Sequence, residues 1–211
     1  MATNKITFWQ LLQNNSIEIP IVQRDYAQGR AGKEYLRKNF LTSLKQALDG
    51  ETLKLDFVYG SVENNTLQPL DGQQRLTTLW LLHWYIALFA GKYEETFNIL
   101  SKFSYETRIS SREFIQNLCN PENFTSFDKK DVVKFIKDAT WYYSAWNQDP
   151  TISSMLRMIK GTNIENKSGE DIIDGLEELF SNTGKDVFEK YWERLTATDA
   201  IAFYQQPLED F

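Results

Sequence analysis

The stretch Pro69-Leu-Asp-Gly-Gln-Gln-Arg-Leu-Thr-Thr78 lies between a strand-like run at residues 66–70 and a long apolar run at residues 76–90. So many consecutive apolar residues indicate a helix that is buried on all sides, and we expect it to run from Gly72 to Gly91. The chain therefore turns from a strand into a helix within a polar stretch. The first N–H groups of a helix lack internal partners and carry partial positive charge, so this junction is suited to binding an anion.

The polar residues of this stretch fit such a site. Gly72 lets the backbone approach a ligand closely, and Arg75 can bind a phosphate through two parallel hydrogen bonds. Asp71 is placed either to cap the helix or to hold a metal ion or a water molecule. Thr77 and Thr78 can donate hydroxyl hydrogen bonds to a phosphate, and packing or capping roles fit them equally well.

A second polar motif, Ile19-Pro-Ile-Val-Gln-Arg-Asp-Tyr-Ala-Gln-Gly-Arg30, follows a strand-like run at residues 17–22. It places Gln23 and Arg24 directly after a strand, as the first motif places its own glutamines and arginine. If the two strands are neighbours in one sheet, both motifs reach one cleft. Glutamine orients a water for attack on a phosphate, and arginine stabilises the transferring phosphoryl group. A solvated strand end and an ordinary helix cap are the alternatives.

A third polar cluster, Tyr105-Glu-Thr-Arg-Ile-Ser-Ser-Arg112, precedes a predicted helix at residues 110–118. Its Tyr105, Arg108 and Arg112 either line the same cleft or belong to the start of their own helix. The run Ser110-Ser-Arg-Glu113 fits a capping box.

Composition limits the function classes that are open to the chain. With 211 residues, 42% of them hydrophobic, it can bury one substantial core or two small ones. The net charge of −6 argues against a generally basic nucleic-acid binder, although residues 24–45 carry +4 and residues 163–211 carry −8. The N-terminus lacks a secretory signal and the apolar run at residues 76–90 is too short for a membrane span, so we expect a cytoplasmic protein.

Single residues exclude further chemistry. The only cysteine, Cys119, rules out internal disulfides and cysteine-based zinc sites within the chain. The only histidine, His83, rules out paired-histidine metal sites and an HNH nuclease centre, and its place in the apolar helix indicates a core role. We interpret the acidic residues between Glu170 and Glu178 as a solvated helix face, and Trp141-Tyr-Tyr-Ser-Ala-Trp146 as core packing rather than a stacking platform for bases.

The pattern predicts an α+β fold in two parts: residues 1–110 mix short strands with helices, and residues 111–211 are mainly helical and end in a strand. We expect helices at residues 6–13, 33–49, 72–91, 93–102, 110–118, 128–139, 151–159 and 169–180. We expect strands at residues 17–22, 54–63, 66–70 and 199–208, with a turn at Asn64-Asn65. Because the chain stops just after a strand, we expect it to be part of a longer protein.

The paired motifs resemble the N-terminal domain of GmrSD-type restriction proteins. Ile19-Pro-x-x-Gln-Arg24, followed about fifty residues later by Asp71-Gly-Gln-Gln-Arg-Leu-Thr-Thr78, carries the resemblance, and Tyr105-x-Thr-Arg108 with Ser111-Arg112 agrees with it. The resemblance spans most of the chain and is strongest to about residue 120. Many relatives follow Gln-Arg with Pro-Tyr-x-Trp. Here Tyr26 is retained, but the charged Arg30 stands in a setting that is aromatic in those relatives. This difference affects which nucleotide the site holds and whether it holds one.

This resemblance implies a small ParB/sulfiredoxin-like sheet with packed helices, in which a helix N-terminus binds the phosphates of a nucleotide. It implies Mg²⁺-assisted hydrolysis of a nucleoside triphosphate, GTP or ATP, coupled to sensing modified DNA in phage defence. It also implies that a full-length protein carries a C-terminal nuclease domain. The catalytic set would be Asp71, which is also the candidate metal ligand, with Gln73, Gln74 and Arg75. The nucleotide-binding set would be Gln23, Arg24, Tyr26, Arg30, Gly72, Thr77 and Thr78.

Two other functions fit the residues. In the first, the domain is a non-catalytic nucleotide- or DNA-binding module, and Arg24, Arg30, Lys33 and Arg37 form a DNA-facing surface. In the second, a toxin–antitoxin-like or scaffolding role rests on the acidic C-terminal third alone.

Overall fold

The computed structural model of the chain describes residues 4–20, 26–28, 30–106, 108–161 and 173–207. Its helices are α1 (Phe8–Asn14), α2 (Glu34–Asp49), α3 (Gln73–Ala90), α4 (Tyr93–Leu100), α5 (Ile109–Leu118), α6 (Val132–Asp138), α7 (Pro150–Lys160), α8 (Leu176–Leu179) and α9 (Lys185–Ala197). Its strands are β1 (Asn4–Ile6), β2 (Ser16–Ile19), β3 (Leu53–Lys54), β4 (Val58–Glu63), β5 (Thr66–Asp71), β6 (Phe103–Tyr105) and β7 (Ile201–Pro207).

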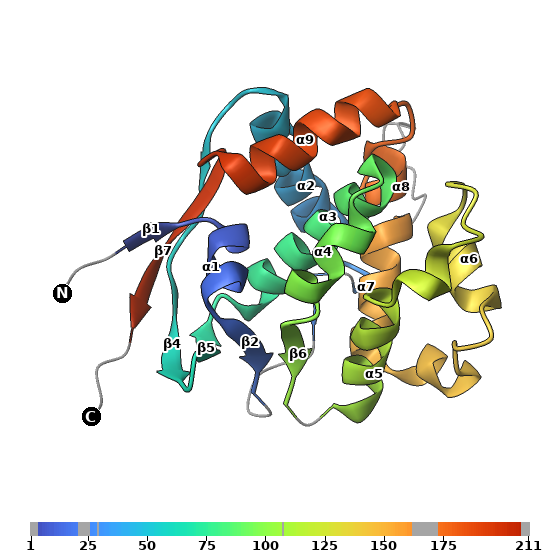
Figure 1. The fold of residues 1–211 in the computed structure, drawn as a ribbon, viewed down its shortest axis with the longest axis horizontal. Coiled ribbons are helices and arrows are strands. Elements are labelled where there is room, and N and C mark those ends of the chain that lie inside the picture. Colours follow the sequence, from blue (N-terminus) through green and yellow to red (C-terminus); the bar gives the residue numbers. More distant parts are fainter. Residues whose placement is uncertain (1–3, 21–25, 29, 107, 162–172, 208–211) are drawn as a thin grey trace.

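The strands of the described residues form one mixed sheet in the order β1-β7-β4-β5-β2-β6, with β3 beside β7. Figure 1 shows the strands gathered on one side of the molecule, with α9 above them and α5, α6 and α7 beyond β6. The predicted α+β class is confirmed. Strand β2 is parallel to both of its neighbours, β5 and β6, whereas β4 and β5 form an antiparallel hairpin. The Asn64-Asn65 turn of this hairpin has φ values of 49° and 59°, as a tight primed turn requires.

Helix α3 is the centre of the core. Its residues from Leu76 to Leu88 are buried on every side, as the long, mainly apolar run predicts. The polar ends of its tryptophans are satisfied, because the indole N–H groups of Trp80 and Trp84 donate to the carbonyls of Leu100 and Leu118, each at 2.8 Å. His83 is buried as expected, and its Nδ1 lies 2.7 Å from the carbonyl oxygen of Leu79. No helix in the described part of the chain is both long and apolar enough to cross a bilayer.

The C-terminal residues complete the sheet and the core that the N-terminal residues begin. Strand β7, predicted at residues 199–208, lies between β1 and β4. Helix α9, which the sequence analysis missed, packs on α3, and the rings of Phe188 and Phe89 lie 5.0 Å apart. Its buried residues Phe188, Tyr191, Trp192 and Leu195 follow helical spacing, so the signal was present in the sequence.

Several local predictions are wrong. The run at residues 54–63 is divided into β3 and β4: both pair with β7 in parallel, but residues 55–57 between them are not in strand conformation. The short strands β1 and β6 were not predicted. Within the described residues, the helix expected at residues 169–180 is limited to α8. Helix α5 has Arg108 at its N-cap without a side-chain hydrogen bond, so the capping box at Ser110 is not formed. Trp146 is buried against Phe114 at 5.8 Å, which confirms core packing for that tryptophan.

Candidate functional site

The two polar motifs follow neighbouring parallel strands at the same edge of the sheet. In the pairing of β2 with β5, Ile17 lies opposite Leu67, and both strands run toward that edge. Parallel strands bring their carboxyl ends together, so the expected adjacency of the strand ends is confirmed. Gln23 and Arg24 lie outside the described residues, and their place in the cleft stays a prediction.

Residues 26–28, which lie within the Ile19–Arg30 motif, are bound to the first turns of α3. The side-chain Oε1 of Gln74 accepts from the backbone N–H of Ala27 at 2.7 Å and from that of Gln28 at 3.4 Å. The hydroxyl groups of Tyr26 and Thr78 lie 2.8 Å apart, and Thr78 also donates to Oε1 of Gln28. Three consecutive residues of this loop (residues 26–28, the pocket loop) therefore depend on side chains of the Pro69–Thr78 motif.

Gly72 forms the tight corner between β5 and α3. Its φ of 89° lies in the left-handed region, and a Cβ atom there would lie 2.7 Å from Cγ2 of Val58. Gly72 is the N-cap residue, and no side chain caps the helix, so of the two roles that fit Asp71 in the sequence, the helix cap is not formed. The physical reason is that the Asp71 carboxylate instead pairs with Arg75, at 3.3 Å.

Arg75 is held in a fixed position at the start of α3. Its Nη2 donates to the carbonyl of Phe57 at 2.7 Å, and its Nη1 lies 3.1 Å from the carboxylate of Asp56. The arginine side chain is 18% exposed, whereas those of Asp71 and Asp56 are 56% and 92% exposed. The guanidinium is therefore oriented by a backbone carbonyl and by carboxylates that water already solvates.

A hollow of about 370 Å³ opens at this corner, lined by Gln28, Asp71, Gly72, Gln73, Gln74 and Arg75. The lining unites one residue of the pocket loop with the whole Asp-Gly-Gln-Gln-Arg motif. Because the hollow lies at the N-terminus of an 18-residue helix, it also faces backbone N–H groups with partial positive charge. These are the features of an anion site.

The threonines of the motif are buried beneath the hollow. Thr77 donates to the carbonyl of Gln73 at 2.9 Å. The Thr78 hydroxyl also lies 3.0 Å from the carbonyl of Gln74, so its single proton has two acceptors in reach, this carbonyl and Oε1 of Gln28. The Thr77 hydroxyl also lies 3.1 Å from that of Tyr105. Burial raises the pKa of Tyr105, which keeps the phenol neutral. In this structure the two threonines join the first turn of α3 to its neighbours, and contact with a nucleotide would require their hydroxyls to change partners.

The third polar cluster lies beside β6 rather than around the hollow. Arg112 donates from Nε to the carbonyl of Tyr105 at 3.3 Å, and Arg108 donates from Nη1 to the hydroxyl of Thr151 at 3.3 Å. Neither arginine is among the described residues that line the hollow. Their interactions instead tie β6 and α5 to helix α7.

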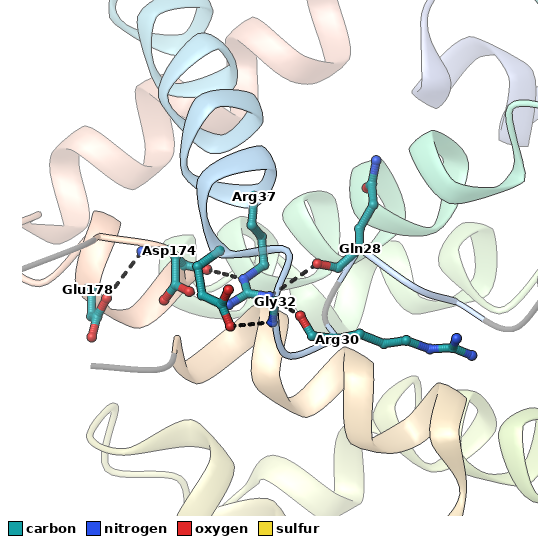
Figure 2. Close-up of polar contacts among 7 residues, drawn as sticks. Gln28, Arg30, Gly32, Arg37, Asp174 and Glu178 are labelled. Atoms are coloured by element: carbon teal, nitrogen blue, oxygen red, sulfur yellow. Dashed lines mark hydrogen bonds and ion pairs between the residues drawn. The ribbon is translucent and has the colours of Figure 1, made fainter. Parts of the chain in front are cut away.

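The basic residues after the pocket loop are not one surface. Arg30 and Lys33 are exposed, but Arg37 is only 1% exposed, so its predicted place on a DNA-facing surface is wrong. Figure 2 shows the reason: the Arg37 guanidinium lies between Asp174 and the backbone of the pocket-loop region. Asp174 is itself fully buried, so the interpretation of the acidic run as a solvated face is wrong at this residue.

Asp71 is the one carboxylate of the Pro69–Thr78 motif that could bind a metal ion at the hollow. The described residues contain no group of three or more His, Cys, Asp or Glu side chains arranged to hold a metal. Asp71 lines the hollow and is half exposed. This matches the way Mg²⁺ is usually held, by one or two carboxylates together with water and substrate phosphates.

Comparison with known proteins agrees with the sequence motifs. The family model described as "GmrSD restriction endonuclease, N-terminal domain" matches residues 8–196, which include both polar motifs and nine-tenths of the chain. A search of curated proteins found no match. The family resemblance stated from the motifs is confirmed.

Proposed function

Because this chain belongs to the family of GmrSD restriction endonuclease N-terminal domains, we propose that it binds and hydrolyses a nucleoside triphosphate as the sensor domain of a modification-dependent restriction protein. The observation that carries the proposal is the hollow at the start of α3. It joins an open helix N-terminus, a glycine in the left-handed conformation, an oriented arginine and three glutamines in about 370 Å³. This volume is in the range of ligand pockets.

In the proposed complex, the N–H groups at Gly72 and the first turn of α3 bind phosphoryl oxygens. Arg75 stabilises the charge that develops on the transferring phosphoryl group, and its existing contacts with Phe57 and Asp56 orient it beforehand. Gln74 is committed through its Oε1 to the pocket loop. We therefore assign the orientation of the attacking water to Gln73.

Asp71 would hold Mg²⁺ together with the phosphates of GTP or ATP. When bound, the ion neutralises charge on the phosphate oxygens and fixes their orientation. The protein's own contribution is to present a solvated carboxylate beside the helix N-terminus. Modified DNA and a C-terminal nuclease domain are the partners that we propose for the full-length protein.

Phosphate release from GTP and ATP with Mg²⁺ tests this function. We expect turnover by the unmodified protein, and its loss in Arg75→Ala and in the pair Gln73→Ala/Gln74→Ala. Arg194→Ala is the matched control, because Arg194 also donates to backbone carbonyls (Ala47 and Glu51, at 3.0 and 2.8 Å) but is not among the residues that line the hollow. Equal turnover by all four proteins would contradict the proposal.

Nucleotide-binding and DNA-binding measurements beside the phosphate-release assay separate this function from that of a binding module without catalysis. Nucleotide binding without turnover, or DNA binding that weakens steeply with salt, would assign the hollow to a switch or to a backbone phosphate.

A further inference from the structure

Arg37 joins two distant parts of the chain through one buried guanidinium. Its Nε donates to the backbone carbonyl of Asp174 at 2.8 Å, and its Nη2 forms an ion pair with the Asp174 carboxylate. Its Nη1 donates to the carbonyls of Gln28 at 3.2 Å and Arg30 at 3.0 Å. Figure 2 shows the guanidinium between these partners. Among the described residues, Gln28 is also the one outside the Asp71–Arg75 motif that lines the hollow.

Burying the Arg37–Asp174 ion pair is energetically unfavourable unless its geometry satisfies both charges. Both side chains are fully buried, and taking two charges out of water carries a large desolvation penalty. A planar guanidinium with donors in fixed directions can meet a carboxylate on one side and two carbonyls on the other, which a lysine ammonium cannot do. The structure uses this property to fix the pocket loop from outside the hollow.

Asp174 is anchored in turn by the helical part of the chain. Its N–H donates to the carboxylate of Glu178 in α8 at 3.3 Å. The next residue, Gly175, crosses the end of α7 so closely that a Cβ atom on it would lie 2.1 Å from the backbone nitrogen of Gly161. The position of the pocket loop therefore depends on how the junction of α7 and α8 is packed.

We propose that Arg37 and Asp174 are positioning residues that make nucleotide binding at the hollow depend on the packing of the α7–α8 junction. The pair holds Gln28 and the Ala27 amide in place for Gln74, and a partner or domain that shifts the junction changes nucleotide affinity through this connection. The consequence for affinity rests on the proposed nucleotide site, whereas the mechanical coupling of loop and junction does not.

The test uses three variants, each compared with the unmodified protein. Arg37→Lys keeps the positive charge but loses the planar guanidinium with its several donors, and Asp174→Asn loses the carboxylate charge. Asp49→Asn is the matched control: Asp49 is the last residue of α2, and its carboxylate pairs with Lys45 at 2.6 Å and accepts from the Tyr191 hydroxyl at 2.7 Å, at the opposite end of the helix from Arg37. Each protein is measured by thermal unfolding, by hydrogen exchange at Ala27, Gln28 and Arg30, and by titration with GTP and ATP in Mg²⁺.

We expect Arg37→Lys and Asp174→Asn to speed exchange at the pocket loop and to weaken nucleotide binding by about ten-fold, at temperatures where they remain folded. Asp49→Asn should change neither the loop exchange nor the nucleotide affinity. Faster unfolding with unchanged loop exchange and unchanged affinity would overturn the proposal, because the pair would then be purely structural. If no protein binds nucleotide, the proposed function fails, and the loop exchange still decides the coupling.

Should both variants fail to fold, the unmodified protein decides the matter by hydrogen exchange in low denaturant. The Arg30 N–H bonds to the Ala27 carbonyl, and the Phe180 N–H bonds to the Leu176 carbonyl, both at 3.0 Å. Coupling predicts one common free energy of opening for these two amides. Opening of Phe180 while Arg30 stays protected would contradict it.

Discussion

The side-chain oxygen of Gln74 lies 2.7 Å from the backbone nitrogen of Ala27, a residue 47 positions earlier in the chain. This hydrogen bond joins the residues that follow strand β2 to the helix that follows strand β5. It makes the hollow at the start of α3 a composite of both polar motifs. The same glutamine also accepts from Gln28, so the pocket loop depends on one side chain for both amides.

Replacing Gln74 by alanine should therefore loosen the pocket loop. A partly buried amide without a partner costs about 1–3 kcal/mol, so we expect a lower free energy of unfolding and faster hydrogen exchange at Ala27 and Gln28. Urea unfolding and exchange measured by NMR check this. Gln74→Glu keeps an acceptor oxygen and should restore protection.

Gln73→Ala is the companion variant. It should lower turnover while the exchange rates of the pocket loop stay unchanged. The division of roles between the two glutamines would be refuted if Gln73→Ala loosened the loop as much as Gln74→Ala.

Gly72 should tolerate alanine far less well than Gly91, at the other end of α3. Both have left-handed φ values, 89° and 73°, and each pays a strain of about 1–2 kcal/mol for a Cβ atom. At Gly72 the new atom would also lie 2.7 Å from Val58, whereas at Gly91 the nearest atom, in Lys185, is 3.7 Å away. Urea unfolding should show the larger loss for Gly72→Ala. Equal losses would mean that the corner between β5 and α3 adjusts freely.

His83 should make the protein less stable as the pH falls. The side chain packs against the rings of Phe8, Trp9 and Trp192, and this burial lowers its pKa from 6.5 to about 4. Between these two pH values the unfolded chain binds a proton that the folded protein does not. Stability should therefore be highest above pH 6.5 and fall by roughly 3 kcal/mol as the pH decreases to 4 through this residue alone.

His83→Leu isolates this contribution, because the carboxylates titrate in both proteins. Urea unfolding at about pH 7.5 and about pH 5 should show a smaller pH dependence in the variant. The same pH dependence in both proteins would show that the neutral, buried state of His83 does not limit stability.

Features that depend on local sequence were predictable. The length of α3 follows from its long, mainly apolar run, and the Asn64-Asn65 turn follows from the tolerance of asparagine for positive φ. The strands β1 and β6, of three residues each, were missed because they exist only through pairing with β7 and β2. Such pairing leaves no periodic pattern in so short a segment.

The site was predictable to the same extent. The two motifs could be placed at neighbouring strand ends because each follows a strand-like run. The Arg37–Asp174 pair could not be predicted from the sequence. Its two residues are 137 positions apart, and each lies in a run of charged residues that is typical of a solvated surface. The burial of both side chains results from tertiary packing. The pairing of Asp71 with Arg75, in place of a helix cap, also depends on the folded structure.

Calorimetric titration of the protein with non-hydrolysable analogues of GTP and ATP, with and without Mg²⁺, tests the central claim most directly. We expect Mg²⁺-dependent binding of at least one analogue, weakened by about 100-fold in Arg75→Ala, which loses a charged donor to the phosphates, and unchanged in Arg194→Ala. Absence of binding by the unmodified protein, or equal binding by both variants, would contradict a phosphate site at the start of α3.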